Sequence, residues 1–170
     1  MILKHLLGLK TRDVAPIYSA IVTAARQPHF YAEWGVPDTI DGRFDMIVLH
    51  LFLVLDRLRT GRDYEDVSQD LTDYFYKDMD RSLREMGVGD LSVGKKVRKM
   101  AEACYGRLMA YGKAMALEDN ELELALVRNV YAGDGSVRGA KELAAWMRKA
   151  HAMLREQPAE RIAAGVIQWP

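Results

Sequence analysis

The most apolar stretch of this 170-residue chain is residues 46–55, MIVLHLFLVL. Asp41 opens the predicted helix that contains this stretch, and apolar residues lie on nearly every side of that helix as far as Arg59. Ten residues of helix span roughly 15 Å, about half the thickness of a bilayer core. A helix that is apolar all round and too short to cross a membrane belongs in the centre of a globular protein. We therefore expect residues 41–59 to form the buried helix around which the others pack.

Amphipathic helices are predicted on both sides of this central helix. Apolar residues recur at intervals of three and four, on one helical face, in residues 13–26, 64–86, 92–115, 120–131 and 138–156. Gly and Pro residues separate these segments, and Gly87 is a natural helix stop in the left-handed conformation. Residues 28–39 are predicted to form a loop, and no run of alternating residues predicts a strand. The sequence thus predicts an all-α fold, a single globular bundle of about six helices formed by residues 1–170.

The composition argues against catalysis and against general nucleic-acid binding. Lys and Arg together number 24, as do Asp and Glu, so the net charge is zero and no DNA partner is expected. The only cysteine, Cys104, falls on the apolar stripe of its helix, and His50 lies within the central helix, where a core role is expected. No histidine has the spacing of a known metal-ligand motif, and no nucleophile or phosphate-loop pattern occurs. We therefore expect neither an enzyme nor a bound metal or cofactor.

The charges are unevenly distributed along the chain. Residues 63–80 contain seven acidic residues and one lysine, whereas residues 92–113 contain six basic residues and one glutamate. On a helical wheel, Lys95, Arg98 and Lys99 lie opposite the apolar stripe and point to solvent. One interpretation is a solvated face that partly neutralises its acidic neighbour. The other is a docking surface for a membrane surface, a ribosome or an acidic protein segment.

Aromatic residues are more concentrated than a core requires. Phe30, Tyr31 and Trp34 lie within five residues of one another, and residues 74–76 are three consecutive aromatics on a predicted helix. Because of this spacing, they cannot all face inward. Either the aromatic loop folds back over the core, or part of this surface forms a groove for an apolar client, which the nine methionines would make adaptable.

Three segments resemble one known family. They are residues 31–59, YAEWGVPDTIDGRFDMIVLHLFLVLDRLR, residues 78–100, DMDRSLREMGVGDLSVGKKVRKM, and residues 126–131, LVRNVY. Together they resemble the ubiquinol–cytochrome c chaperone family, and its bacterial branch in particular, over a core of residues 31–131. The resemblance implies an assembly chaperone for ubiquinol–cytochrome c reductase, respiratory complex III, that binds newly made cytochrome b. The mitochondrial members also work with a second small assembly factor, a partner that we do not assume for this chain.

The resemblance and the charge pattern together indicate a partner-binding surface. We expect polar side chains near the connection at residues 87–91 to contact polar loops or a terminus of cytochrome b, while the aromatic loop supplies apolar contact. The predicted partner-binding residues are Phe30, Tyr31, Trp34, Asp78, Asp80, Arg81, Arg84, Asp90, Lys95, Lys96, Arg98 and Lys99. Asp80 and Arg84 are also spaced to form an ion pair that only steadies their helix. A second hypothesis is a general helical adaptor that docks on a ribosomal or RNA surface, or on an anionic membrane surface, through the basic helix.

We do not expect the first ten residues, MILKHLLGLK, to form an export signal. Their apolar part is short, and no small-residue cleavage site follows it. We expect a cytoplasmic protein without a signal peptide or a transmembrane helix, able to lie peripherally on the inner membrane.

Overall fold

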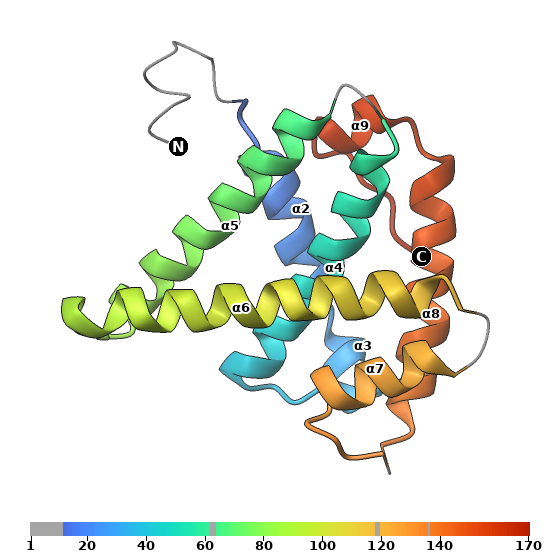
Figure 1. Ribbon diagram of the computed structural model, residues 1–170. Helices are drawn as coiled ribbons and strands as arrows, with labels where there is room; N and C mark the ends of the chain where they lie inside the picture. The colour runs from blue at the N-terminus through green and yellow to red at the C-terminus, as the bar shows by residue number, and fades with distance from the viewer. Residues whose placement is uncertain (1–11, 62–63, 118–119, 136) are drawn as a thin grey trace.

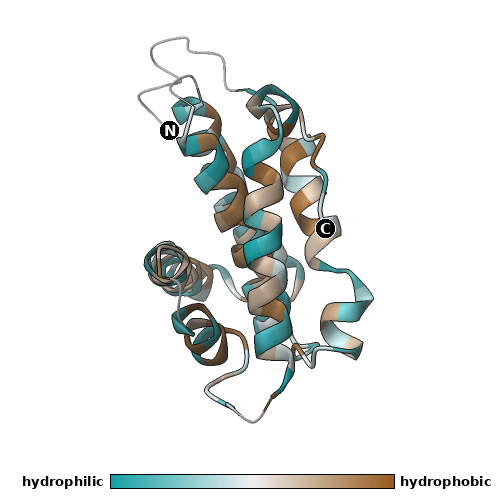
Figure 2. Ribbon diagram, turned by 90° about the vertical axis from the view of Figure 1, so that its right-hand side faces the viewer, coloured by the Kyte–Doolittle hydropathy of each residue, from teal (hydrophilic) through white to brown (hydrophobic). Residues whose placement is uncertain are grey.

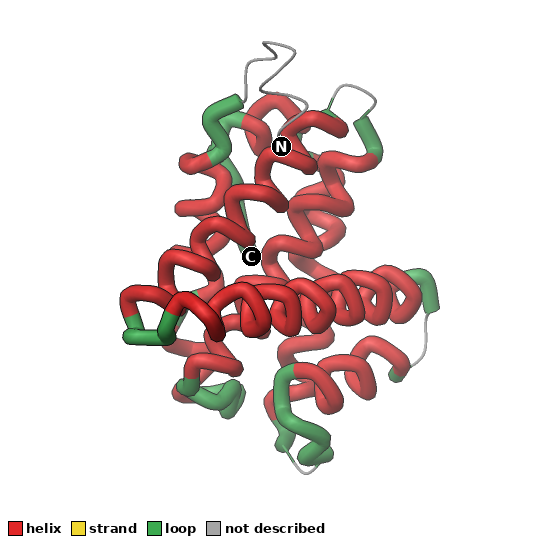
Figure 3. The backbone as a smooth tube through the Cα atoms, turned by 60° about the vertical axis from the view of Figure 1, so that its left-hand side comes forward, coloured by secondary structure: helices red, strands yellow, loops and turns green. Residues whose placement is uncertain are grey.

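The computed structural model describes residues 12–61, 64–117, 120–135 and 137–170, which contain eight helices. These are α2 (Ala15–Ala25), α3 (Pro28–Ala32), α4 (Ile40–Arg59), α5 (Glu65–Glu85), α6 (Asp90–Met115), α7 (Glu121–Asn129), α8 (Gly139–Glu156) and α9 (Ala159–Ala163). Within this part of the chain the backbone is made of helices and loops, with no strand (Figure 3). The predicted all-α fold is confirmed, and the six longest helices correspond to the six predicted ones. The prediction of a loop at residues 28–39 was wrong for its first turn, which forms α3.

Helix α4 is the centre of the fold, as its sequence predicts. The Thr39 hydroxyl caps its first turn and accepts a hydrogen bond from the Gly42 amide at 3.1 Å. Residues 44–54 are buried without interruption, and α4 packs against α2, α5, α6, α8 and α9. The buried core forms a continuous cluster to which every described helix contributes. Burying the most apolar helix in the middle removes the largest apolar surface from water.

Helices α5 and α6 meet at a turn that projects away from the rest of the molecule (Figures 1 and 3). Gly87 ends α5 with a φ of 81°, and the Val88 amide then donates to the Leu83 carbonyl at 3.0 Å. The predicted left-handed stop is therefore confirmed. Helix α6 begins at Asp90, two residues earlier than predicted, and then runs across α4. Figure 2 looks along α6 and shows hydrophilic and hydrophobic residues alternating on most helices.

Hydrogen bonds near the C-terminus hold the end of α8 against α4. The predicted helix at residues 138–156 is observed as α8. The Arg57 side chain at the end of α4 donates to the carbonyls of Leu154 and Gln157, so it satisfies backbone groups at the end of α8. After α9 the chain folds back, and Gln157 exchanges two side-chain hydrogen bonds of 2.9 Å with the backbone of Gln168. This return segment, residues 164–170, was not predicted to have a structural role.

Some predicted features lie outside the described residues. These are the first ten residues, including His5, and the acidic Asp63. Among the residues that the structure describes, no helix combines the length and the apolar character needed to cross a bilayer.

Candidate partner-binding groove

A large open groove lies between the α5–α6 pair and the body of the protein. Its volume is about 1530 Å³, and its walls come from α2, the start of α4, the second half of α5, α6 as far as Arg107 and the end of α7. We call it the basic groove. Sites for small molecules typically have volumes of about 300–1,000 Å³, so this groove is of a size to receive a segment of polypeptide.

The floor of the basic groove is apolar. Phe44, Ile47, Met79 and Leu83 line it and retain 7–9% exposure, whereas most of the remaining core is fully buried. Two large apolar side chains at the groove are exposed: Ile40, from the start of α4, is 64% exposed, and Met86, from the end of α5, is 49% exposed. Exposed apolar residues at the margin of a nearly buried apolar floor are typical of a protein interaction site.

The rim of the basic groove is positively charged, although the whole chain is neutral. Seven basic and four acidic side chains line it, a net charge of three positive. Four of these basic side chains form no ion pair with any carboxylate of the described residues: Arg26, Lys96, Lys99 and Arg128. Unpaired cations beside an apolar floor favour a ligand that carries negative charge.

A partly buried ion pair lies in the basic groove. Arg107 Nη2 is 2.7 Å from Asp45 Oδ1, and the guanidinium of Arg107 also lies over the Phe44 ring at 5.6 Å. Asp45 is 4% exposed, and burial raises its pKa to about 7 even though Arg107 acts in the opposite direction. Beside this pair, the Tyr18 hydroxyl donates to Asp78 at 2.8 Å, and burial together with that carboxylate raises the pKa of Tyr18.

The structure brings only some of the predicted charged residues to the groove. Asp78, Arg81, Lys96 and Lys99 line it, and Arg81 pairs with Asp78. The others lie at the projecting turn or on the outer face of α6, and these are Asp80, Arg84, Asp90, Lys95 and Arg98.

At the projecting turn the predicted charges neutralise one another. Arg84 contacts the carboxylate of Asp80 at 2.6 Å and also that of Asp90, so it links the end of α5 to the start of α6. We call these three residues the tip cluster. On α6, Arg98 pairs with Glu102 at 3.5 Å, while Lys95 is exposed. The tip cluster fits the alternative reading of Asp80 and Arg84 as a pair that steadies the helix.

The three aromatic residues of the α3 region do not line the basic groove. Phe30 is 1% exposed and packs edge-on against Trp146 and Trp34, so its predicted role as an exposed contact does not fit its position. Tyr31 and Trp34 are partly exposed and pack against the core, and the Tyr31 hydroxyl donates to the Ala25 carbonyl at 2.8 Å. The aromatic segment therefore folds back over the core, which was the structural alternative.

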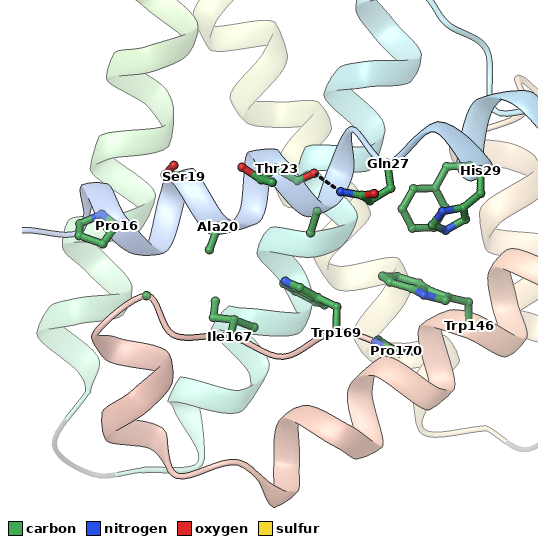
Figure 4. A pocket seen from close by; sticks show the side chains of 13 residues that line it. Pro16, Ser19, Ala20, Thr23, Gln27, His29, Trp146, Ile167, Trp169 and Pro170 are labelled. Carbon is green, nitrogen blue, oxygen red and sulfur yellow. Dashed lines mark hydrogen bonds between the residues drawn. The ribbon is translucent and has the colours of Figure 1, made fainter.

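A second, smaller hollow lies between the return segment and α2 (Figure 4). This C-terminal cleft has a volume of about 630 Å³, and Ile167 and Trp169 from the return segment line it opposite α2. Next to it, the fully buried His50 ring lies 5.0 Å from the rings of both Trp146 and Trp169. His50 Nδ1 is 2.8 Å from the Met46 carbonyl oxygen, and burial lowers the pKa of His50 to about 4. His50 is thus a neutral core residue, as its place in the central helix predicts.

Several residues of the basic groove were not identified from the sequence: Arg26, Ile40, Asp45, Met86, Arg107 and Arg128. One usable signal was present. Asp45 interrupts the buried face of α4, and a buried carboxylate requires a charged or hydrogen-bonding partner from another helix. That requirement points to a basic residue on a neighbouring helix, which Arg107 supplies.

The groove and its surroundings offer groups suited to non-covalent contact with a partner. The described residues contain no group of three or more His, Cys, Asp or Glu side chains that could hold a metal ion. Cys104 is buried, and burial raises the pKa of its thiol to about 11, which disfavours the thiolate. The arrangement offers apolar surface, cations and hydrogen-bonding groups to a partner.

Over the described residues, the fold and the site define an all-helical protein with a large amphipathic groove between a projecting helix pair and its body. The chain belongs to the ubiquinol–cytochrome C chaperone family, which it matches over residues 32–169. The predicted family membership is thus confirmed.

Individual relatives agree with this assignment. The chain is 24% identical to ubiquinol-cytochrome-c reductase complex assembly factor 1 of Xenopus laevis over 115 residues. That alignment covers 67% of this chain and 58% of the relative. It is 29% identical to Protein CBP3, mitochondrial, of Saccharomyces cerevisiae over 112 residues, and this alignment covers 62% of this chain and 32% of that protein. The chain therefore spans between one third and three fifths of these relatives. The crystal structure of the Cbp3 homolog from Brucella abortus superimposes with a TM-score of 0.84 at 39% identity, over 100% of this chain and 97% of that one.

Proposed function

We propose that this protein is an assembly chaperone for ubiquinol–cytochrome c reductase and that it holds newly made cytochrome b through protein–protein contacts. The observation that carries the proposal is the basic groove, which is large enough for a polypeptide segment and has an apolar floor with exposed apolar residues at its margin. The names of the relatives support it, because they include complex assembly factors for the same reductase.

The groove provides what a temporary holder of an apolar client needs. Its floor covers apolar surface that would otherwise associate wrongly before the client meets its partner subunits. Its rim is charged and open to solvent, so binding depends partly on polar contacts that a later partner can displace. A modest and partly polar interface of this kind is typical of transient complexes.

A second function is favoured by one observation, the exposed basic face of α6. Lys95, Lys96 and Lys99 are all exposed, and Lys95 lies outside the groove. This face supports a helical adaptor that docks on a ribosomal or RNA surface or on an anionic membrane. Such docking depends steeply on salt and does not require cytochrome b.

The deciding experiment is co-purification with tagged cytochrome b from cells, combined with a strain that lacks this protein. We expect the protein to be recovered with cytochrome b and the deletion strain to contain little active ubiquinol–cytochrome c reductase. A deletion strain that builds the active complex in normal amounts would overturn the chaperone proposal. Salt-sensitive recovery with ribosomes, in cells that make no cytochrome b, would favour the adaptor instead.

A further inference from the structure

We propose that the basic groove receives an amphipathic helix of the client whose apolar face is bordered by acidic residues. This inference rests on the proposed function and adds the chemistry of the bound segment. Four features of the groove lead to it: its size, its apolar floor and margins, its unpaired cations and the spacing of those cations.

The size of the groove matches a short helix. A helix about 11 Å across with a rise of 1.5 Å per residue occupies on the order of 140 Å³ per residue. The groove volume of about 1530 Å³ therefore accommodates on the order of ten residues, or three turns. Three turns are enough to present an apolar stripe at positions i, i+3, i+4 and i+7.

The apolar side chains of the groove are placed to contact such a stripe. Ile47, Met79 and Leu83 form part of the floor, and the exposed Ile40 and Met86 come from different helices, α4 and α5. Both exposed residues are large, and a helix laid on the floor would cover them. Met86 is also flexible enough to adapt to different apolar side chains.

The charges of the groove select an acidic partner. Arg26 lies at the end of α2, Lys96 and Lys99 lie on α6, and Arg128 lies on α7, so cations come from three helix regions around the floor. Lys96 and Lys99 are three residues apart on one helix, which matches carboxylates one turn apart on a bound helix. Because the cations are distributed around the groove, they suit a series of carboxylates better than a single lipid phosphate.

Binding of two designed peptides to the full-length protein tests this inference. Each labelled peptide has twelve residues with leucines at helical spacing, and its flanking positions carry glutamate in one peptide and lysine in the other. We expect the glutamate peptide to bind at least about tenfold more tightly in fluorescence anisotropy, with an affinity that falls as salt is raised. Equal binding of the two peptides, or tighter binding of the lysine peptide, would overturn the inference.

Variants locate the binding to the groove. We expect Lys96→Glu combined with Lys99→Glu to weaken binding of the glutamate peptide about tenfold or more. The matched control is Lys141→Glu combined with Lys149→Glu, which makes the same charge change on exposed positions of α8 outside the groove and should leave binding within twofold. Circular dichroism confirms that both double variants fold. Equal effects of the two double variants would contradict the proposed location.

A lipid source for the negative charge is tested separately. Vesicles of phosphatidylglycerol and phosphatidylcholine are offered to the protein with and without the glutamate peptide. We expect the peptide to bind in the absence of vesicles, whereas binding to phosphatidylglycerol vesicles without any peptide binding would overturn the inference. In cells, a Lys96→Glu and Lys99→Glu protein that still binds tagged cytochrome b and restores the reductase would refute the acidic-helix inference while leaving the chaperone proposal intact.

Discussion

The substitution Asp45→Asn should make the protein lose stability in mild acid, although the native protein barely changes over the same range. Two buried titratable residues on α4 cause this difference. Burial raises the pKa of Asp45 to about 7 and lowers the pKa of His50 to about 4. The two shifts have opposite effects on how many protons the folded state binds, so they compensate each other in the native protein.

The sign and size of each effect follow from proton linkage. The folded state binds the proton of Asp45 more tightly than the unfolded state, whose pKa is near 3.8, so stability rises as the pH falls from about 7. The folded state holds the proton of His50 less tightly than the unfolded state, whose pKa is near 6.5, so stability falls as the pH drops below that value. When the pH falls from 8 to 5, protonation of Asp45 raises the free energy of unfolding by about 3 kcal/mol, and the effect of His50 lowers it by about 2 kcal/mol. The native protein should therefore change little, and the Asp45→Asn variant should lose about 2 kcal/mol.

Urea denaturation followed by tryptophan fluorescence at pH 8, 7, 6 and 5 measures the effect directly. The control is Glu160→Gln, which removes an exposed carboxylate from α9 and should follow the native protein at every pH. Asp45→Asn also removes the ion-pair partner of Arg107, which lowers the free energy of unfolding by itself. For this reason the test compares how the free energy of unfolding changes with pH in each protein, and not its absolute value. Parallel curves for the Asp45→Asn variant and the native protein would refute the proposed compensation.

Three further results are expected from the packing. Gly139→Ala should destabilise the protein by about 3 kcal/mol or more in urea denaturation, because the added Cβ would lie 1.7 Å from the Trp34 carbonyl oxygen. The control is Gly106→Ala on open helix surface, which should stabilise the protein by up to about 1 kcal/mol. Trp169→Ala should lower the free energy of unfolding by about 3 kcal/mol and reduce the near-ultraviolet circular dichroism, because Trp169 packs against His50 and Trp146. Cys104 should react with a disulfide reagent at pH 8 only as fast as the protein unfolds, because its thiol is buried and its pKa is raised to about 11; rapid reaction of the folded protein would contradict this.

The helices could be predicted because each carries its own evidence in the sequence. Residues 46–55 are apolar on every side, and that pattern already requires burial at the centre of the fold. The return segment lacks such a local signal. Trp169 is held by rings from α4 and α8, and Gln157 bonds to Gln168 across the turn, so its position depends on contacts between segments that local patterns do not reveal.

The same distinction applies to the candidate site. Lys96 and Lys99 were selected because they belong to a run of basic residues, and both line the groove. Arg26 and Arg128 are single basic residues in unrelated helices, and only the tertiary fold brings them to the same rim. Phe30 shows the opposite case, because a local cluster of aromatics suggested an exposed contact while the fold buries its ring.

The distribution of charge separates two uses of basic residues in this protein. At the tip cluster, Arg84 is already bound by Asp80 and Asp90, so its charge serves the junction of α5 and α6. In the basic groove the net charge is three positive in a chain whose total is zero, so the remainder of the chain has a net charge of three negative. A groove with a net positive charge, on a chain that is otherwise slightly negative in total, attracts an acidic segment more strongly than the average surface does. This asymmetry makes the groove, rather than the exposed face of α6 as a whole, the surface at which a charge reversal should first impair the protein.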